Sequence, residues 1–495
     1  MGKNLLESAL SKESRYFTKE DFLNLYLEGE FQMVNFHYIG GDLRIKTLTF
    51  YIDKPEYLES ILTYGERIDG SSVFESIDTG SSDLYLLPVY RTAYFEPFEE
   101  IPTIGFFCRI FEADGTPFRN SFVNILIKAK ELLKKETGYE FKALGELEYY
   151  IISEEKPKYP TKEQKGYHAS EPFALGGEFR KDAMEIITNI GGTIKYGHTE
   201  VGTFYHEDKY YEQHEIEFLP TDPEETAYSL LKAKWVLRNL TQKVEKYKDL
   251  VVTFAPKIAV GKAGSGLHFH FLLEKDGKNV MLDENGKLSE VARKMIGGVL
   301  EIAKPLSAFG NMVPVSYLRL VPHQEAPTSI CWGDRNRSVL IRVPLGWNVD
   351  IEKMQQLTGN EFDSIPRAEN KQTVEIRSAD NSANFFLFLS GLILGAYRGL
   401  TSGKSLETAE KLYAPVNIFK EEGYEFDHLP ASCYEAAEEL EKNRAVFEEN
   451  GLFPAGIIDS TIKKLKAFND KGLSEMLYGN KESLKELVDK YLHCG

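Results

Sequence analysis

The chain has 495 residues, too many for one ordinary domain core, so two domains of unequal size are expected. Hydrophobic residues make up 42% and charged residues 27%, which is ordinary for a globular protein. The formal net charge of -17 argues against nucleic acid or an anionic membrane as the main partner, although phosphate substrates need only a local basic pocket.

Cysteine usage and apolar runs indicate a cytoplasmic protein. The four cysteines are far apart and form no CxxC pair, which argues against a zinc or redox motif and fits a reducing compartment. The N-terminus has no apolar run of the signal-peptide kind. The longest apolar run, 385–396, is shorter than the roughly 20 residues of a membrane span, so it is expected to be a buried core helix.

The first part of the chain is predicted to form short strands, because β-branched and aromatic residues stand between Gly, Asp and Pro. A helix with a Lys-rich end follows, and the turn before it at 114–117 suggests a boundary between domains 1–115 and 116–495. The expected strands are 47–52, 83–88 and 105–110, and the helix is 121–137.

The rest of the chain is predicted to be a large α/β domain with a substantial antiparallel sheet. The expected strands are 143–152, 200–204, 215–219, 251–254 and 268–273, with a polar loop at 153–177. The expected helices are 179–188, 223–247, 289–309 and 383–400, with more from residue 434 onward.

Two nucleotide-binding signals are rejected. Segment 399–405 resembles a phosphate-binding loop but is one residue short, and it follows a helix where that motif requires a strand. Segment 261–266 is glycine-rich but is not followed by a helical pattern, so a dinucleotide site is disfavoured.

Acidic and histidine pairs stand at strand spacing. Glu146 and Glu148 are two residues apart, as are His268 and His270, so each pair should share one face of its strand. Two carboxylates on one face repel unless a cation lies between them, although a solvated edge strand would explain the pair as well. The histidines next to a Gly-Ser-Gly turn suit a metal or phosphate, but they would also suit a hydrogen-bonded core.

Further polar residues extend this set. Glu200 and Glu215 follow histidines at nearby positions, and Glu375 shares a predicted strand face with Arg377. Arginines cluster in the preceding segment at positions 319, 335, 337 and 342, where a salt-bridged surface is the alternative. Carboxylates with histidines hold Mg²⁺ or Mn²⁺, and arginines neutralise a moving phosphoryl group, so the combination favours phosphoryl transfer.

These segments, taken in order, resemble the type I glutamine synthetase family from about residue 30 to the C-terminus. The segments that carry the resemblance are 68–72, 145–148, 198–201, 264–270, 319–342 and 375–384. It implies an α+β fold, with a small N-terminal β-grasp domain before a large catalytic domain whose curved antiparallel sheet is flanked by helices. It also implies a homo-oligomeric ring, often a dodecamer, whose sites lie between neighbouring subunits.

The resemblance assigns roles to individual residues. One Mg²⁺ or Mn²⁺ ion would be held by Glu148, Glu200 and Glu215, and another by Glu146, His268 and Glu375. ATP would contact His270, Arg337 and Arg342, and glutamate would contact Gly264, Arg319 and Arg377. Ammonium would bind near Asp69 and Ser72 of the neighbouring subunit, and Glu325 would close over the site as a flap. Asp69, Glu325 and Arg337 would take part in catalysis.

The implied reaction is ATP-dependent synthesis of glutamine from L-glutamate and ammonia through a γ-glutamyl phosphate. Two divalent ions would hold the oxygens in line, Asp69 would accept a proton from bound ammonium, and the Glu325 flap would exclude water. A relative that uses an alkylamine or polyamine, a catalytically silent scaffold and a metal-dependent hydrolase are the alternatives. The retained 69–72 segment favours ammonium, and the metal and arginine sets favour an active ligase.

The match departs from the family at several positions. The segment between Glu200 and Glu215 is longer than usual, which makes Glu215 the weaker assignment. Ala263, Leu272 and Thr373 replace the usual Asn, Ser and Arg, with consequences for ATP and the glutamate amino group. Tyr413 lies near a tyrosine that some bacterial members adenylylate, but the residues after it differ.

Overall fold

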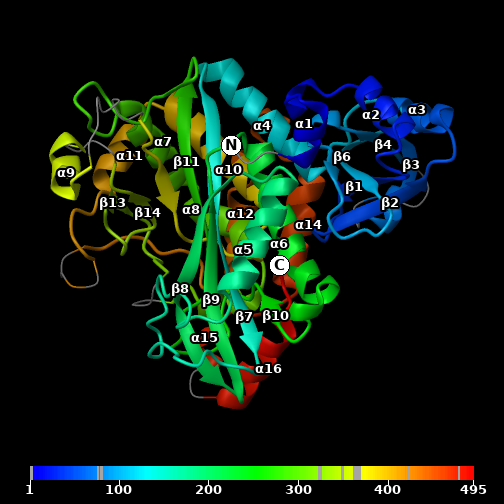
Figure 1. Ribbon diagram of the computed structural model, residues 1–495. Helices are drawn as coiled ribbons and strands as arrows, with labels where there is room; N and C mark the ends of the chain where they lie inside the picture. The colour runs from blue at the N-terminus through cyan, green and yellow to red at the C-terminus, as the bar shows by residue number, and fades with distance from the viewer. Residues whose placement is uncertain are drawn as a thin grey trace.

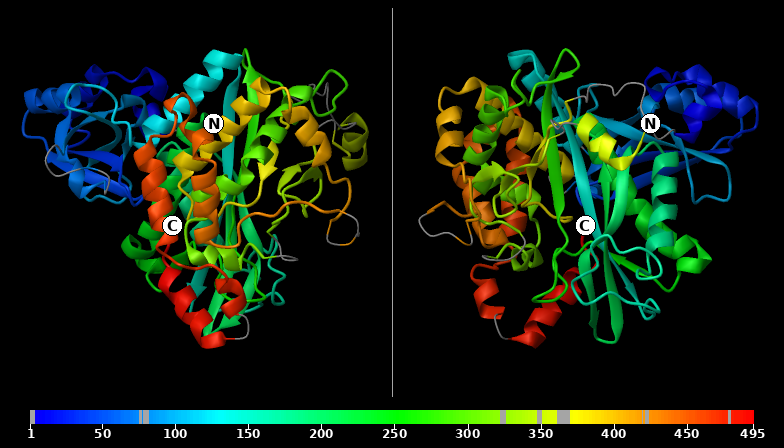
Figure 2. Two further views of the ribbon diagram at one scale, coloured as in Figure 1. Left: turned by 180° about the vertical axis from the view of Figure 1, so that it is seen from behind. Right: turned by 60° about the vertical axis from the view of Figure 1, so that its left-hand side comes forward.

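Two sheets of very different size organise the chain. The computed structural model describes residues 4–74, 77, 82–321, 326–346, 351–360, 370–418, 420, 424–477 and 480–495. Figures 1 and 2 show the N-terminal sheet and its helices set to one side of the larger, curled sheet, which is backed by helices. The predicted α+β architecture is therefore confirmed.

The N-terminal sheet has the strand order β2-β1-β6-β4-β3, with β5 paired to β6. Strand β1 runs parallel to β6, and the other pairs are antiparallel. The strands are β1 (Met33–Ile39), β2 (Ile45–Tyr51), β3 (Glu66–Asp69), β4 (Asp83–Pro88), β5 (Tyr94–Phe95) and β6 (Thr103–Phe111).

The prediction of strands alone for this region was incomplete, because three helices accompany the sheet. They are α1 (Leu5–Leu10), α2 (Lys19–Leu27) and α3 (Pro55–Tyr64). Helix α3 begins with proline at its first turn and buries Leu58, Ile61 and Leu62, which are three and four residues apart. That helical spacing was present in the sequence between two clear strand patterns.

The larger sheet has the order β13-β14-β15-β11-β7-β9-β8, with β10 paired to β7 and β12 paired to β11. Its pairs are antiparallel except for β13 with β14, which confirms the predicted antiparallel sheet. The strands are β7 (Glu140–Ser153), β8 (Ile194–His206), β9 (Lys209–Phe218), β10 (Val251–Thr253), β11 (Leu267–Lys275), β12 (Lys278–Asn279), β13 (Trp332–Asp334), β14 (Ile341–Val343) and β15 (Val374–Ile376).

The predicted helices of this region are present, one of them as two helices, and α9 and α11 are additional helices that were not predicted. The predicted helix 289–309 is two helices, because Pro305 lacks the amide hydrogen needed to continue one helix through this point. The helices are α4 (Phe122–Thr137), α5 (Gly177–Asn189), α6 (Pro223–Lys243), α7 (Glu290–Glu301), α8 (Ala303–Gly310), α9 (Ile351–Thr358), α10 (Phe385–Thr401), α11 (Ser405–Lys411), α12 (Cys433–Lys442), α13 (Arg444–Glu448), α14 (Ala455–Lys466), α15 (Leu473–Leu477) and α16 (Lys481–Tyr491).

Helix α10 is the buried core helix that its apolar sequence predicted. Its residues from Phe385 to Ala396 are all buried, and it packs against α4 and α7. Among the described helices, none is long and apolar enough by itself to cross a membrane, although α10 and α11 together pass that test as a pair bent by 106°.

Neither rejected nucleotide motif has the element order that its motif requires, although residues 261–264 line a cavity of the larger domain. Segment 399–405 joins the end of α10 to the start of α11, and segment 261–266 leads into β11 rather than into a helix. The predicted boundary at residue 115 falls between β6 and α4 and stays a prediction.

Candidate active site

Strand register brings the predicted acids and histidines onto one face of the larger sheet. His268 on β11 lies directly opposite Glu146 on β7, and Glu148 lies opposite Glu215 on β9. The intervening residues, such as Leu147, point into the hydrophobic core on the other face. Each pair two residues apart therefore shares a face, as the strand periodicity predicted.

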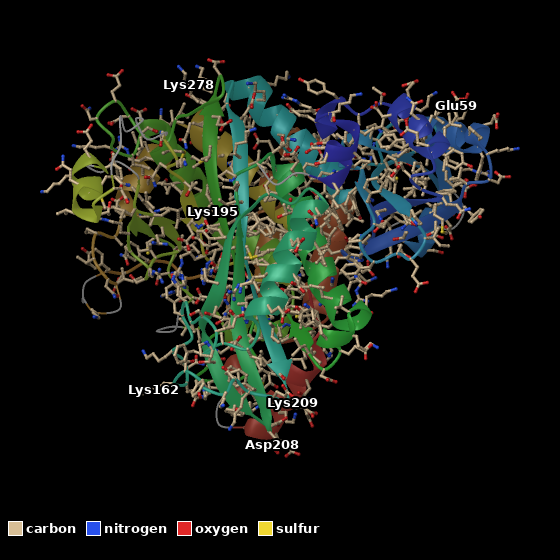
Figure 3. All side chains as sticks on the ribbon, in the orientation of Figure 1. Glu59, Lys162, Lys195, Asp208, Lys209 and Lys278 are labelled. Carbon is tan, nitrogen blue, oxygen red and sulfur yellow. The ribbon has the colours of Figure 1, made fainter. Side chains whose placement is uncertain are left out.

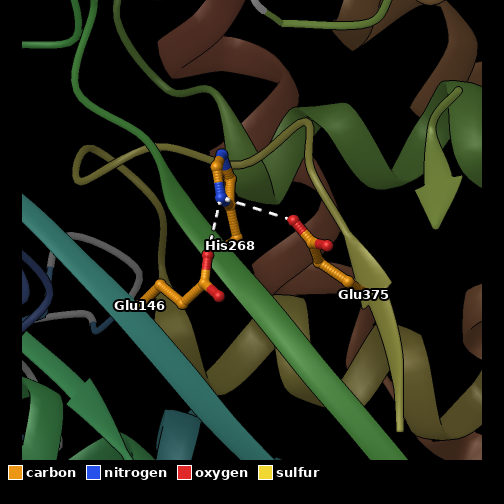
Figure 4. Close-up of side chains that lie close together, drawn as sticks. All are labelled: Glu146, His268 and Glu375. Carbon is orange, nitrogen blue, oxygen red and sulfur yellow. Dashed lines mark hydrogen bonds and ion pairs between the residues drawn. The ribbon is translucent and has the colours of Figure 1, made fainter. Parts of the chain in front are cut away.

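Glu146, His268 and Glu375 form one cluster at the centre of this face (Figure 4). His268 Nδ1 lies 2.9 Å from Glu146 Oε2 and 3.6 Å from Glu375 Oε1. One ligand atom from each residue lies within 4.8 Å of the others, which is close enough for a shared cation. This is one of the two predicted metal sets.

Glu375 is buried and held by two arginines. Arg377 Nε donates to its Oε1 at 2.9 Å, and Arg342 Nη1 donates to its Oε2 at 2.8 Å. Burial and the neighbouring Glu146 raise the pKa of this carboxyl, but Arg377 and the nearby histidines outweigh them, so the pKa lies below its ordinary value. Glu375 is therefore a fixed anion that orients both guanidinium groups.

A second cluster joins His198, Glu200 and Glu215. His198 Nε2 lies 3.2 Å from Glu215 Oε1, and its Nδ1 lies 3.9 Å from Glu200 Oε1. Burial, reinforced by the charge of Glu148, raises the pKa of Glu200 to about 8. Burial and the charges of Glu146 and Glu148 likewise raise the pKa of Glu215 well above its usual range. A bound cation would stabilise the ionised form of both carboxyl groups, because its positive charge would offset their mutual repulsion and their burial.

Glu148, which the resemblance placed in this second set, lies on the wall of the same cavity. Its Oε2 accepts hydrogen bonds from Gly266 N at 2.7 Å and from Gln213 Nε2 at 3.0 Å. His198 is the third residue of the group in which ligand atoms of Glu200 and Glu215 lie within 4.8 Å of one another. His198 was not among the residues predicted for the site, although its position two residues before Glu200 on a strand was a usable signal.

The longer segment between Glu200 and Glu215 does not displace Glu215. Register between β8 and β9 shifts between Thr199 and Thr203, so Glu200 lies in a bulge that turns its side chain. The hairpin of β8 and β9 has its tip near Asp208 and Lys209, far down the molecule in Figure 3. Despite the register shifts, Glu215 pairs with His198 of β8.

His270 and Glu217 form a third group with Glu146. His270 Nε2 lies 2.8 Å from Glu146 Oε1, and its Nδ1 lies 3.0 Å from the hydroxyl of Thr373. Thr373, one of the departures from the family, thus contacts the histidine assigned to ATP. Glu217 was missed by the sequence analysis, and Lys195 of β8, labelled in Figure 3, contacts it at 2.7 Å.

Arg319 crosses behind His268 and fills the space left by two glycines. Its Nη2 lies 3.2 Å from His268 Nε2, and its Nη1 donates to Ser378 O at 2.9 Å. A Cβ on Gly266 would lie 2.6 Å from Arg319 Nη2 and 2.7 Å from His268 Nε2. A Cβ on Gly264 would lie 3.1 Å from Arg319 Cγ. These glycines allow the arginine and the histidine to meet.

One cavity of about 750 Å³ contains the assigned metal, ATP and glutamate residues. A cavity of this size accommodates a nucleotide-sized ligand. Arg337 is exposed at its rim, whereas Arg342 is partly buried and its Nε has no hydrogen-bond partner among the described residues. The predicted residues on its wall are Glu146, Glu148, Glu200, Glu215, Gly264, His268, His270, Arg319, Arg337, Arg342, Glu375 and Arg377.

Asp69 and Ser72 do not line this cavity. Asp69 ends β3, which lies at the outer side of the N-terminal sheet and away from β14 in Figures 1 and 2. Its carboxylate accepts hydrogen bonds from Ser71 and, at 2.7 Å, from the Ser72 hydroxyl. These hydroxyls hold the pKa of Asp69 well below its usual range. Glu325, the predicted flap residue, lies outside the described residues.

The structure also places the other positions at which the sequence differs from the family pattern. The Ala263 carbonyl accepts a hydrogen bond from Tyr150 at 2.8 Å, and Leu272 is buried in the main core. The Tyr413 hydroxyl donates to Asp334 at 3.0 Å.

The donor set fits divalent cations. Each cluster offers carboxylate oxygens and one imidazole nitrogen, which is the chemistry that Mg²⁺ and Mn²⁺ accept. Arg342 Nε, which has no hydrogen-bond partner among the described residues, leaves one N–H group available to bind an anion at the same cavity.

Comparison with protein families decides the relationship. The model described as "Glutamine synthetase, beta-Grasp domain" matches residues 30–113, and "Glutamine synthetase, catalytic domain" matches residues 124–467. The chain belongs to the glutamine synthetase family. Glutamine synthetase of Clostridium saccharobutylicum is 30% identical over 86% of this chain and 90% of its own. The Pyrococcus furiosus glutamine synthetase is 32% identical over 80% and 82%.

Solved structures share the fold of this chain. A Plasmodium falciparum glutamine synthetase superposes with a TM-score of 0.75 at 20% identity, over 92% of this chain and 96% of that one. A ligand-free structure of GmaS superposes with a TM-score of 0.68 at 18% identity, over 90% and 94%. At these identities the superpositions confirm the glutamine synthetase fold.

Proposed function

We propose that this protein is a glutamate–ammonia ligase, which uses ATP to convert L-glutamate and ammonia into glutamine, ADP and phosphate. One observation carries the proposal: two carboxylate–histidine clusters and three buried or half-buried arginines converge on a single cavity. A hydrolase needs the cations alone, whereas the joining of two substrates also needs a clamp for a carboxylate substrate. Family membership and relatives named glutamine synthetase support the same conclusion.

The two clusters would hold divalent cations. Glu146, His268 and Glu375 would bind one ion, and Glu200 and Glu215, with Glu148 or His198, would bind the other. When bound, Mg²⁺ or Mn²⁺ neutralises phosphate charge and holds the reacting oxygens in line. Among the chain's own groups, His270, Arg337 and Arg342 face the same cavity and would contact ATP.

Arg319 and Arg377 would bind the carboxylates of glutamate, and Gly264 would approach its amino group with bare backbone. The γ-carboxylate oxygen would then attack the terminal phosphorus of ATP, with ADP as the leaving group. Ammonia would attack the carbonyl carbon of the resulting γ-glutamyl phosphate, expelling phosphate. Asp69 would accept the proton that ammonium must lose before it can attack.

Asp69 and Ser72 would act in the site of a neighbouring subunit. Their exposed position on the outer side of the N-terminal sheet supports a homo-oligomer with sites between subunits. Glu325 remains the proposed flap. The four cysteines, which are all free, support a reducing cytoplasm as the location.

Amine competition tests the reaction. Phosphate release would be measured with glutamate, ATP and Mg²⁺ or Mn²⁺, in the presence of ammonium, methylamine or putrescine, and products would be identified by mass spectrometry. We expect glutamine and the fastest turnover with ammonium. Faster turnover with methylamine or putrescine would replace ammonia by that amine, and no glutamate-dependent phosphate release would refute a ligase.

Matched variants exclude a contaminating activity. Glu375→Gln removes the charge that orients Arg342 and Arg377, so turnover should fall about 100-fold or more. Glu290→Gln changes an exposed acid on α7 and should leave turnover unchanged.

A further inference from the structure

Gln213 lies on β9 between the proposed metal ligands and the loop proposed to contact glutamate. It shares a strand face with Glu215 and Glu217, because the three residues are two apart, and all three line the active-site cavity. Gln213 is only 2% exposed. A buried amide needs hydrogen-bond partners for its donors and its acceptor, so its contacts show what it holds in place.

Both N–H groups of the Gln213 side chain bind residues of the proposed site. Nε2 donates to Glu148 Oε2 at 3.0 Å and to Gly264 O at 3.0 Å, and Oε1 accepts from Gly202 N at 3.0 Å. A backbone carbonyl can only accept and a backbone N–H can only donate, so these partners allow one orientation of the amide. Both hydrogens of Nε2 are used by the protein itself, which suits a positioning role rather than contact with a substrate.

The three partners belong to separate parts of the proposed site. Glu148 on β7 is a proposed metal ligand, and Gly264 precedes β11 and is the proposed neighbour of the glutamate amino group. Gly202 lies on β8, two residues after the proposed metal ligand Glu200. A Cβ on Gly202 would lie 2.6 Å from Gln213 Oε1, so the missing side chain lets the amide reach the β8 backbone. One side chain thus joins the metal ligands to the glutamate loop.

The glutamate loop has an anchor that does not depend on this amide. Ala263 N donates to Gln164 Oε1 at 2.7 Å, and Ala263 O accepts from the Tyr150 hydroxyl at 2.8 Å. Gln213 adds a bond one residue further on, at Gly264 itself. Loss of the Gln213 amide should therefore loosen the residue proposed to contact glutamate without releasing the whole loop.

We propose that Gln213 is a positioning residue that makes glutamate binding depend on the bound cation. When Glu148 holds a cation, its carboxylate is fixed, and one N–H of Gln213 is fixed with it. The other N–H then holds the Gly264 carbonyl beside the place proposed for the glutamate amino group. Without the cation, Glu148 is repelled by the neighbouring acids, and this chain of hydrogen bonds loosens. The inference rests on the proposed function, because it uses the metal and glutamate assignments.

Titration calorimetry on the full-length protein measures this dependence without turnover, because ATP is left out. Glutamate is titrated with and without saturating Mn²⁺, and Mn²⁺ is titrated with and without saturating glutamate. We expect Mn²⁺ to strengthen glutamate binding by about tenfold or more, and glutamate to strengthen Mn²⁺ binding by the same factor, since coupling between two sites is reciprocal.

Gln213→Met keeps the length of the side chain and removes its hydrogen bonds. The factor by which saturating Mn²⁺ strengthens glutamate binding should fall about tenfold. Mn²⁺ alone should bind about tenfold more weakly, because Glu148 loses one of its hydrogen-bond donors. In the rate assay at saturating Mn²⁺, KM for glutamate should rise about tenfold at an unchanged kcat, whereas a lower folded fraction would reduce kcat and leave KM unchanged.

Two further variants complete the series. Gln213→Asn retains an amide on a side chain one methylene shorter and should give intermediate values, and it carries the test if the methionine variant does not fold. Gln242→Met is the matched control, because it makes the same change at an exposed position of α6 outside the active-site cavity. Its binding and rate constants should stay within about twofold of those of the unmodified protein.

The possible failures are distinguishable. Absence of glutamate binding to the unmodified protein in the presence of Mn²⁺ would reject the proposed substrate, and this inference with it. Glutamate binding with the same Mn²⁺ dependence in the unmodified protein and in the folded Gln213 variants would overturn the inference alone. A fall in kcat at unchanged KM for glutamate would likewise assign Gln213 a purely structural role.

Discussion

Gly266 contributes to both the proposed glutamate site and the proposed metal site, because it has no side chain. Its backbone amide donates to Glu148, while the space above its Cα is occupied by Arg319 and His268. Any side chain there would move a proposed metal ligand and a proposed substrate clamp at once. The residue therefore acts through positioning rather than through chemistry of its own.

Gly266→Ala should lower the ligase rate about 100-fold, because displacing catalytic groups by roughly 1 Å has an effect of that size. The added Cβ would lie within 2.7 Å of His268 Nε2, so that side chain must shift. Steady-state rates with ammonium and glutamate measure the effect. Gly403→Ala is the control, since a Cβ there meets nothing within 4 Å. Equal rates in both variants would contradict this account.

Glu200 makes the stability of the metal-free protein depend on pH. Its pKa rises from 4.5 to about 8 on folding, so the folded state holds an extra proton between these values. The stabilising contribution of the proton is present below pH 4.5 and is lost as the pH rises through 8, by up to about 1.4 kcal/mol per pH unit.

Cation binding should reverse this trend, because Mg²⁺ takes the place of the proton. We expect the rise in the urea midpoint on adding Mg²⁺ to grow from pH 6 to pH 8. Glu200→Gln has no proton to lose and should show a smaller gain. The same pH slope in this variant and in the original protein would show that Glu200 is not responsible.

At the scale of elements, α7 and α10 approach closely because glycines face each other across the contact. A Cβ on Gly298 would lie 2.1 Å from Gly395 O and 2.5 Å from Gly399 Cα. The obstructing atoms belong to the backbone of α10, which cannot move aside as a side chain can. This contact fixes α10, the central buried helix of the domain, against its neighbour.

Gly298→Ala should lower the free energy of unfolding by about 3 kcal/mol, the upper end of the usual cost of overpacking, because the obstructing atoms are backbone. Equilibrium urea unfolding measures the change. Gly456→Ala in α14 is the matched control, because the Cβ would meet Asn120 Nδ2 at an ordinary 3.6 Å. There the better helix propensity of alanine should leave stability unchanged or slightly higher. A loss in the control as large as in Gly298→Ala would reject the packing explanation.

At the scale of the whole molecule, the position of Asp69 is the observation behind the proposed homo-oligomer. The residue assigned to ammonium is exposed and lies outside the cavity that contains the other substrate residues. A ring of subunits resolves this separation, because each N-terminal domain can serve the catalytic domain next to it.

Subunit mixing tests this arrangement. Asp69→Ala and Glu375→Ala should each be nearly inactive alone, but their co-expression should recover about a quarter of the original activity, because one site in four combines two intact halves. Co-expression of Asp69→Ala with Asp69→Asn is the control and should recover nothing. If the mixed oligomer also stayed inactive, each site would belong to a single chain.

Local patterns in the sequence determined most of the fold. Strand periodicity placed Glu146 with Glu148 and His268 with His270, because side chains two apart on a strand share a face whatever surrounds them. The apolar run in α10 predicted a buried helix for a similar reason. The collinear motifs added the family, which the comparisons confirmed.

Tertiary structure alone decided how these strands meet. The pairing of β8 with β9 placed His198 with Glu200 and Glu215, and the pairing of β7 with both β9 and β11 brought Glu217 near Glu146 and His270. Such contacts depend on the packing of whole elements, and no local pattern encodes the distance between two strands or between a helix and a distant loop.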